Sequence, residues 1–148
     1  ALIAFVGLVH LVNMILAAVS GIWLAEPLTL QRLMGWVFSP FALVMGVPWE
    51  DAHEVGRLLG TKTILNEFLA YQALQPLAGG GVIGERSVTI ATYALCGFAN
   101  FGSVAILVGG LGMIDPDRKS LYAHFGLWAL VAGTLAAFMT ACYAGMLA

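Results

Sequence analysis

The sequence predicts an all-α membrane protein with transmembrane helices, a re-entrant helical hairpin and one discontinuous, partly unwound transmembrane helix. Three observations predict this class. Hydrophobic residues make up 61% and charged residues 9% of the 148 positions, whereas soluble domains average roughly half apolar and a quarter charged residues. Uncharged runs long enough to cross a bilayer recur along the chain. Weak helix formers and isolated charges interrupt some of these runs, as in re-entrant and broken segments.

The composition also excludes several functions. Six basic and eight acidic residues are too few to surround the core of a soluble domain, so lipid must cover the surface. The net charge of −2 and the lack of a basic run argue against nucleic acid as a partner. Histidine and cysteine show no metal-ligand spacing, and the sequence has neither a nucleophile elbow nor a phosphate-binding loop. We therefore expect no enzyme, no metal site and no cofactor.

The first expected element, residues 1–25, is a spanning helix. Residues 2–24 carry no charge, and at about 1.5 Å per residue they cross a hydrocarbon core of about 30 Å. Residues 26–48 are expected to form an interfacial, amphipathic segment or a broken helix. Its Ser39-Pro40 pair favours a break, because proline removes a backbone donor and biases the preceding residue away from helix.

Residues 49–84 are expected to form the re-entrant hairpin. Polar residues are densest at 49–57, which must reach water, and the rest of the segment has only two charges before its end, Lys62 and Glu67. A helix that enters the membrane, turns near its middle and leaves on the same side explains buried charges between two polar flanks. A single spanning helix is the alternative.

Residues 87–114 are expected to form the broken transmembrane helix. They carry no charge, and one straight helix of this length would measure about 42 Å, which exceeds the bilayer unless the helix tilts or breaks. Weak helix formers and polar side chains cluster near the middle, at Gly97, Asn100, Gly102 and Ser103. We therefore expect an unwound midpoint there.

A short charged turn, residues 115–119, precedes the terminal transmembrane helix expected over residues 120–148. Arg118 and Lys119 form the one cationic pair of the sequence that lies in a short loop. The positive-inside rule therefore places this turn on the cytoplasmic side and residues 49–57 on the outer side.

Lys62 and Glu67 are candidate functional residues, because a charge within an apolar membrane segment costs several kcal/mol unless it faces protein, water or a partner. An ion pair between the two is one alternative. Their five-residue spacing separates them by about 140° on a straight helix. A break between them would let Lys62 support one arm of the hairpin while Glu67 faces a cavity.

Asn66, Asn100 and Ser103 add polar groups near these charges. Asn100 and Ser103 are three residues apart, which places them on one face of a helix. A carboxylate, an amide and a hydroxyl match a polyhydroxylated solute, because sugar hydroxyls donate to Glu67 and accept from an asparagine amide. Two alternatives stay open: a structural membrane subunit whose buried polar residues only hold the helix bundle together, and an intramembrane enzyme that uses Glu67 as acid or base.

Two motifs resemble those of the concentrative nucleoside transporter family, of the nucleoside permease type. Residues 60–71, Gly-Thr-Lys-Thr-Ile-Leu-Asn-Glu-Phe-Leu-Ala-Tyr, are similar to the family signature G-x-K-x-x-x-N-E-F-x-A-Y. Residues 96–103, Cys-Gly-Phe-Ala-Asn-Phe-Gly-Ser, with Gly-Gly-Leu-Gly at 109–112, are similar to the family's later broken helix. The resemblance covers essentially the whole chain and corresponds to the C-terminal half of the family.

The resemblance implies an ion-coupled nucleoside symporter that works by alternating access, with sodium or protons as the coupling ion. By residue-level correspondence, Glu67, Asn100 and Ser103 would bind the ribose of the substrate. Phe98 would lie near the base. The chain would therefore contribute the ribose-binding half of the substrate site, while the preference for purine or pyrimidine stays open.

Further expectations follow from the same resemblance. Lys62 and Asn66 would support the hairpin, and the coupling-ion site would lie in an N-terminal half that this sequence lacks. Similar proteins form homotrimers, in which residues 1–48 would act as scaffold. The expected location is the plasma membrane, which is the inner membrane of a bacterium. We expect a piece of a longer protein that cannot transport on its own.

Overall fold

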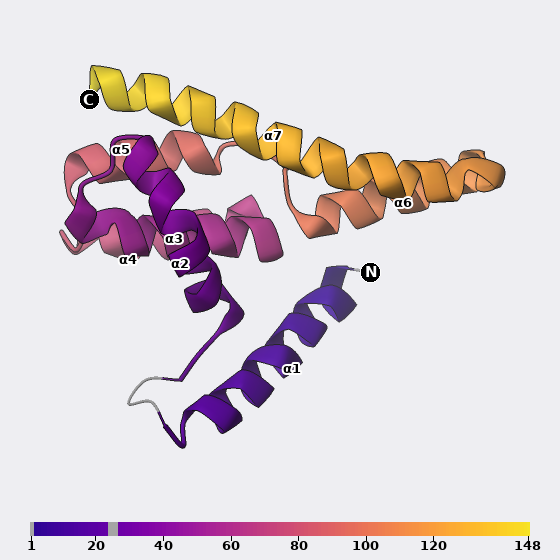
Figure 1. Ribbon diagram of the computed structural model, residues 1–148, viewed down its shortest axis with the longest axis horizontal. Coiled ribbons are helices and arrows are strands. Elements are labelled where there is room, and N and C mark those ends of the chain that lie inside the picture. The colour runs from indigo at the N-terminus through magenta and orange to yellow at the C-terminus, as the bar shows by residue number, and fades with distance from the viewer. Residues whose placement is uncertain (1, 24–26) are drawn as a thin grey trace.

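The computed structural model describes residues 2–23 and 27–148, and within these ranges every regular element is a helix. Figure 1 shows their arrangement, with the long α7 running beside both α5 and α6. The elements in chain order are α1 (Leu2–Ser20), α2 (Leu30–Val44), α3 (Trp49–Ile64), α4 (Glu67–Gly79), α5 (Glu85–Leu95), α6 (Phe101–Ile114), the short 3-10 helix η1 (Pro116–Arg118) and α7 (Lys119–Leu147). The all-helical class predicted from composition is therefore confirmed.

Helix α1 is shorter than the uncharged run that predicts it. It ends at Ser20, whose hydroxyl accepts a hydrogen bond from the Leu28 amide at 2.8 Å. Of the remaining predicted residues, 21–23 form a turn, and 1, 24 and 25 lie outside the described residues. Asn13 ties the helix to the start of α2, because its side chain accepts from the Leu30 amide at 2.8 Å and donates to Gln31 at 3.0 Å.

Helix α2 runs through Ser39 and Pro40 without interruption, so the broken helix, one of the two alternatives for residues 26–48, is wrong. Thr29 caps its first turn by accepting from the Arg32 amide at 3.2 Å. Within the helix, the Ser39 hydroxyl donates to the Gly35 carbonyl at 2.6 Å. Such a bond to the carbonyl four residues back is compatible with continuous helix, and tertiary packing on α3 outweighs the local preference against it.

Helices α2 and α3 pack with their backbones in close contact. A Cβ added at Gly56 would lie 2.4 Å from the Gly35 carbonyl oxygen, and one added at Gly60 would lie 2.5 Å from the Met34 Cβ. The glycines of α3 thus allow an approach that any side chain would prevent. This packing fixes α3, and with it the residues that follow at its end.

Helices α3 and α4 occupy the segment that predicts a hairpin. Helix α3 ends at Ile64 and α4 begins at Glu67. The helix is therefore interrupted between Lys62 and Glu67, and the segment does not form one continuous spanning helix. A second interruption separates α5 from α6, where residues 96–100 are not helical. That the first pair re-enters the membrane, and that the second pair makes one discontinuous span, stay predictions.

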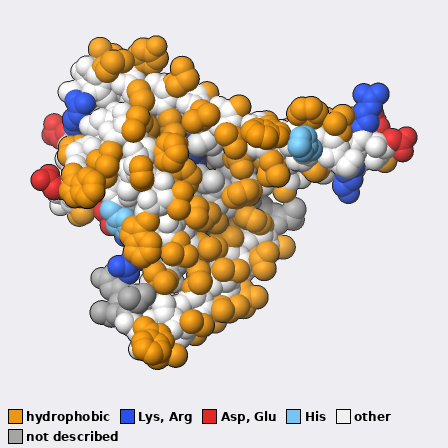
Figure 2. All heavy atoms as spheres, viewed as in Figure 1, with side chains coloured by type: hydrophobic (Ala, Val, Ile, Leu, Met, Phe, Trp, Pro, Cys, Tyr) orange, Lys and Arg blue, Asp and Glu red, His pale blue; other side chains and the backbone are white. Residues whose placement is uncertain are grey.

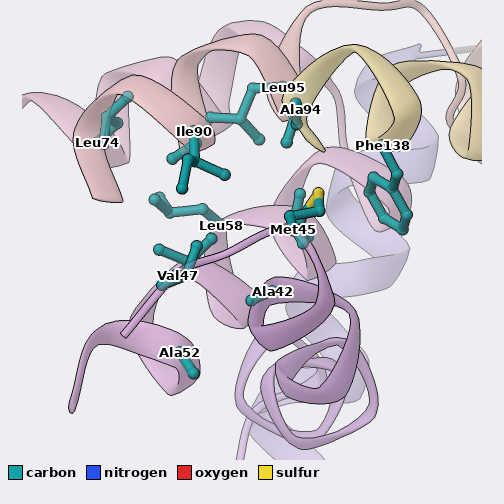
Figure 3. Packing of buried hydrophobic residues seen from close by; sticks show 14 of the residues in the cluster. Ala42, Met45, Val47, Ala52, Leu58, Leu74, Ile90, Ala94, Leu95 and Phe138 are labelled. Carbon is teal, nitrogen blue, oxygen red and sulfur yellow. The ribbon is translucent and has the colours of Figure 1, made fainter. Parts of the chain in front are cut away.

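The core lies where α2, α3, α5 and α7 meet, and it includes Ala70 and Leu74 of α4 (Figure 3). Ala42, Leu58, Ile90 and Phe138, one from each of these four helices, are at most 6% exposed. The apolar packing of these side chains is what holds the four helices together. Residues 65–66 and 96–100 both follow directly from helices of this core, so the interruptions start from fixed points.

The surface is mostly apolar, with hydrophobic side chains spread over the face seen in Figure 2. Two stretches, Ile3–Ser20 and Pro116–Leu147, are helical, long and apolar enough to cross a membrane. Large side chains such as Trp23 and Leu147 are 86% and 90% exposed. Soluble proteins rarely leave apolar area of this extent in water, so the surface agrees with the composition.

Candidate functional site

The candidate site lies where the two interruptions of the helices meet. Asn66 caps α4, because its side chain accepts a hydrogen bond from the Leu69 amide at 2.9 Å. Asparagine is a favoured residue at this position, since its side-chain oxygen satisfies an amide that has no partner within the helix. The cap fixes the start of α4 and presents Glu67, the next residue, at the positive end of the helix dipole.

Asn100 caps α6 in a reciprocal arrangement with Ser103. Its side-chain oxygen accepts from the Ser103 amide at 2.7 Å, and the Ser103 hydroxyl accepts from the Asn100 amide at 3.3 Å. The same hydroxyl donates to the Asn100 carbonyl at 2.8 Å and makes a very short contact with the Phe98 carbonyl. Ser103 therefore fixes residues 98–100, at the end of the interruption, against the start of α6.

One hydrogen bond joins the two helix starts. The Asn100 side-chain amide donates to a carboxylate oxygen of Glu67 over 3.1 Å. Asn100 is only 3% exposed, while Glu67 is half-buried. A hydrogen bond to a charged group contributes more than one between neutral groups, so this contact links the orientation of α4 to that of α6.

Lys62 reaches the end of α5 instead of pairing directly with Glu67. Its ammonium donates to the Ala94 carbonyl oxygen at 3.0 Å, and the residue is 1% exposed. A second tie lies nearby, because the Tyr71 hydroxyl donates to the Thr92 carbonyl at 2.7 Å. Both arms of the α3–α4 pair are thus anchored to α5, the helix that leads into residues 96–100.

Phe98 and Ser103 border a groove along α7. The groove has a volume of about 360 Å³ and includes Gly126 and Gly133 on its α7 side. Phe98 is 78% exposed. An exposed aromatic ring beside polar groups is able to stack on a planar ligand.

The structure brings some of the sequence-predicted residues together and separates others. Glu67 and Asn100 are in contact, and Ser103 and Phe98 lie at the same interruption. Asn66 bonds within its own helix, and Lys62 bonds to the Ala94 carbonyl and not, as in the alternative of an ion pair, to Glu67. The chemistry at this point is the carboxylate of a half-buried glutamate beside a buried amide, which suits a ligand with several hydroxyl groups.

Sequence reasoning missed a second polar contact, far from Glu67. Asp51, in the first turn of α3, accepts from the Gly84 amide at 2.9 Å and from the Ser87 hydroxyl at 2.5 Å. Arg86 donates to the Gly46 carbonyl at 3.0 Å. These bonds fasten the start of α5 to the start of α3. A polar stretch that is simply exposed to water would have the same sequence pattern. The pattern of charges therefore did not predict these hydrogen bonds.

No group of three or more His, Cys, Asp or Glu side chains that could hold a metal ion occurs in residues 2–23 and 27–148. Within the same ranges, every buried side-chain nitrogen or oxygen has a hydrogen-bond partner. The buried side-chain polar atoms of the interruptions are therefore engaged within the protein. A ligand that binds at Glu67 must use its remaining acceptor capacity.

Known proteins similar to this chain are membrane transporters. Solute carrier family 28 member 3 of Rattus norvegicus is 45% identical over 99% of this chain, which corresponds to 23% of that protein. Nucleoside permease NupC of Helicobacter pylori is 42% identical over 98% of this chain and 35% of that protein. A mutant of CNTnw, solved in its intermediate 2 state, superimposes with a TM-score of 0.91 at 43% identity, over 99% of this chain and 37% of its own.

The chain thus spans less than two fifths of the length of each of these proteins. The relatives are transporters or permeases, which are not enzymes, and they support a membrane location for this chain. The family model described as the C-terminus of Na+ dependent nucleoside transporters matches residues 1–145. With this match over nearly its whole length, the chain belongs to the nucleoside transporter family, as a C-terminal region.

Proposed function

We propose that this chain is the C-terminal part of an ion-coupled nucleoside symporter and supplies the ribose-binding half of its substrate site. The observation that carries the proposal is the hydrogen bond between Asn100 and Glu67 at 3.1 Å. It sets a carboxylate and an amide side by side at the starts of two helices. Ribose offers adjacent hydroxyl groups, which donate to a carboxylate and accept from an amide.

In this proposal, Glu67 accepts from the ribose hydroxyls and the Asn100 amide holds that carboxylate in place. Ser103 keeps acceptor capacity on its hydroxyl and lies one turn into α6. The exposed ring of Phe98 stacks against the base. Lys62 and Asn66 support the α3–α4 pair, which acts as a re-entrant hairpin, while α5 and α6 form one discontinuous span.

The coupling ion is sodium or a proton, and the description of the family favours sodium. We propose that its site lies in the N-terminal part of the full-length protein. Transport then proceeds by alternating access, and the family relationship extends the proposal to a homotrimer in the plasma membrane, with α1 and α2 as scaffold.

The proposal is tested by uptake of labelled uridine in cells that express the full-length protein containing this chain. Glu67→Gln keeps the shape and one acceptor oxygen but removes the charge. We expect uptake to fall by at least about tenfold, because a hydrogen bond to a charged group contributes about 1.5–3 kcal/mol. The amount of each protein in the membrane is measured in parallel.

The matched control is Glu85→Gln, because Glu85 is the first residue of α5 just as Glu67 is the first residue of α4, but it is exposed. This change is expected to alter uptake by less than about twofold, as for most surface substitutions. Unchanged uptake in the Glu67 variant would remove this carboxylate from the site. Absence of uridine uptake by the wild-type protein would overturn the proposed substrate.

A structural membrane subunit is the second candidate function, and one observation favours it. The side chains of Asn100 and Ser103 both bond to backbone groups of their own helix start. If holding the helices together is their whole role, Glu67→Gln lowers the amount of folded protein and leaves the uptake per folded molecule unchanged. The same experiment therefore separates the two candidates.

A further inference from the structure

Lys62 is the largest side chain buried to less than 2% exposure in the described residues. It lies in the last turn of α3, and its ammonium donates to the Ala94 carbonyl in the last turn of α5. Burial of a charged amine is costly unless hydrogen bonds and opposite charge compensate for it. The surroundings of the ammonium must therefore provide that compensation.

The end of α5 has the right polarity for a cation. The last carbonyl groups of a helix lack partners within the helix and carry the negative end of its dipole. In discontinuous membrane helices, such ends and the unwound carbonyls beside them coordinate cations. An ammonium has three donor hydrogens, so it can bond to more than one of these carbonyl groups.

The backbone that leaves α5 passes close to this ammonium. A Cβ added at Gly97 would lie 3.9 Å from the Lys62 Nζ atom. Three residues later the same segment reaches Asn100, whose amide holds Glu67. The ammonium is thus placed between the fixed end of α5 and the start of the segment that carries Asn100.

A simple ion pair does not account for this geometry. The described hydrogen bond of Lys62 goes to a backbone carbonyl, and the Glu67 carboxylate accepts from Asn100. Two ion pairs between described residues, Arg57 with Glu54 and Arg118 with Asp115, both lie near the surface. A role of Lys62 in balancing the charge of Glu67 is therefore not sufficient to explain why a lysine occupies this position.

We propose that Lys62 is a positioning residue: its tethered ammonium takes the place of a bound monovalent cation at the carboxyl end of α5 and so fixes residues 96–100 for ribose recognition. The inference rests on the proposed function, because it acts through Asn100 and Glu67. It assigns the lysine to the interruption between α5 and α6, in addition to the hairpin on which it lies. This half of the substrate site then needs no mobile ion for its own geometry.

The test compares Lys62→Met with Lys62→Arg in the full-length protein, because the first removes the charge at similar length and the second keeps it. The readout is the ratio of transport efficiency for uridine to that for 2′,3′-dideoxyuridine, which lacks the 2′ and 3′ hydroxyl groups of the ribose. In the methionine variant we expect the KM for uridine to rise about tenfold, since the hydrogen bond from Asn100 to the charged Glu67 carboxylate is weakened. The KM for the dideoxynucleoside should change little, so the ratio falls.

The arginine variant should keep more of this ratio than the methionine variant. A purely structural role would lower Vmax for both substrates and leave the ratio unchanged. The proposal is overturned if the methionine variant in the membrane keeps the wild-type ratio, or if the arginine and methionine variants are lost from the membrane to the same extent. Failure of the proposed function is distinguishable, because the wild-type protein would then take up neither nucleoside.

Discussion

Two interruptions of the helices are built with the same local device but have different tertiary contacts. Asn66 and Asn100 each follow a non-helical segment, and each caps the next helix by accepting from the amide three residues later. Asn66 is half-buried and bonds to Leu69 in its own helix. Asn100 is buried and also donates to Glu67 across the interface. The same residue in the same local role therefore becomes part of a site only where the fold brings a partner within reach.

The backbones of the interruptions differ as well. Between α5 and α6, Gly97 has a φ of 154°, whereas residues 65–66 have no positive φ. Ordinary L-residues rarely adopt the conformation of Gly97, because the Cβ clashes with the backbone. The turn between α3 and α4 is thus made by ordinary residues, and the interruption that positions Asn100 depends on a glycine.

The largest effect in this comparison is expected for Asn100→Asp. Aspartate keeps an oxygen that accepts from the Ser103 amide, so the cap of α6 is retained. It replaces the amide donor with a second carboxylate facing Glu67, and two carboxylates that share a site repel each other. We expect uridine uptake by the full-length protein to fall by at least about tenfold, from the lost bond to a charged group alone.

Asn66→Asp is the matched control, because it also keeps a cap but changes the asparagine whose described bond lies within its own helix. Its uptake should fall by less than about threefold, within the range of cap substitutions that preserve an acceptor. Equal losses in the two variants, at equal amounts in the membrane, would show that the contact between the helices does not distinguish the interruptions.

The next effect in size is expected for Gly97→Ala. The space around a new Cβ is open to 3.9 Å, so steric contact with other residues does not oppose it. The backbone conformation does, and such strain costs of order 1–3 kcal/mol. We expect a lower thermal unfolding temperature in detergent and a higher KM for uridine, because residues 96–100 must change conformation.

Gly79→Ala provides the control for this substitution. Gly79 is the last residue of α4, and a Cβ there would have no neighbour within 4 Å. Alanine in place of a helical glycine should be neutral or stabilising by up to about 1 kcal/mol. If both alanine variants unfold like the wild-type protein, the conformation of Gly97 carries no strain for alanine and the contrast between the interruptions is lost.

The sequence predicts the helical class and the region of each interruption, because both depend on local composition. Long apolar runs without charge predict helices in a membrane, and glycine and asparagine near Asn100 predict the end of regular structure there. The break between Lys62 and Glu67 is also expected, from two charges that a straight helix would place on different faces. Each of these inferences uses only residues that are close in sequence.

The partners of the polar side chains were harder to predict. Lys62 bonds to a backbone carbonyl 32 residues away, and every residue carries such a carbonyl, so no sequence pattern distinguishes Ala94. The helix through Pro40 is a related case, since packing on α3 outweighs the local preference. Residue type and spacing predict which groups need a partner, whereas the tertiary fold decides which partner they find.

The smallest effect is expected for Ser103→Ala, which sharpens the difference between capping and ligand binding. The Ser103 hydroxyl bonds to backbone groups of Asn100 and Phe98, and the aspartate experiment leaves these bonds in place. Their loss should destabilise the start of α6 by about 0.5–2 kcal/mol, as for other caps. Uridine uptake should therefore fall less than in Asn100→Asp.

Ser103→Thr retains the hydroxyl and is expected to restore both the thermal unfolding temperature and uptake to near the wild-type values. The two readouts separate the roles of this residue. If Ser103 acts only as a cap, the unfolding temperature and uptake should fall together in Ser103→Ala. A loss of uptake in Ser103→Ala that exceeds the loss in Asn100→Asp, at an unchanged unfolding temperature, would mean that the hydroxyl contacts the ribose directly. The start of α6 would then bind substrate through its first turn and not only hold Glu67 in place.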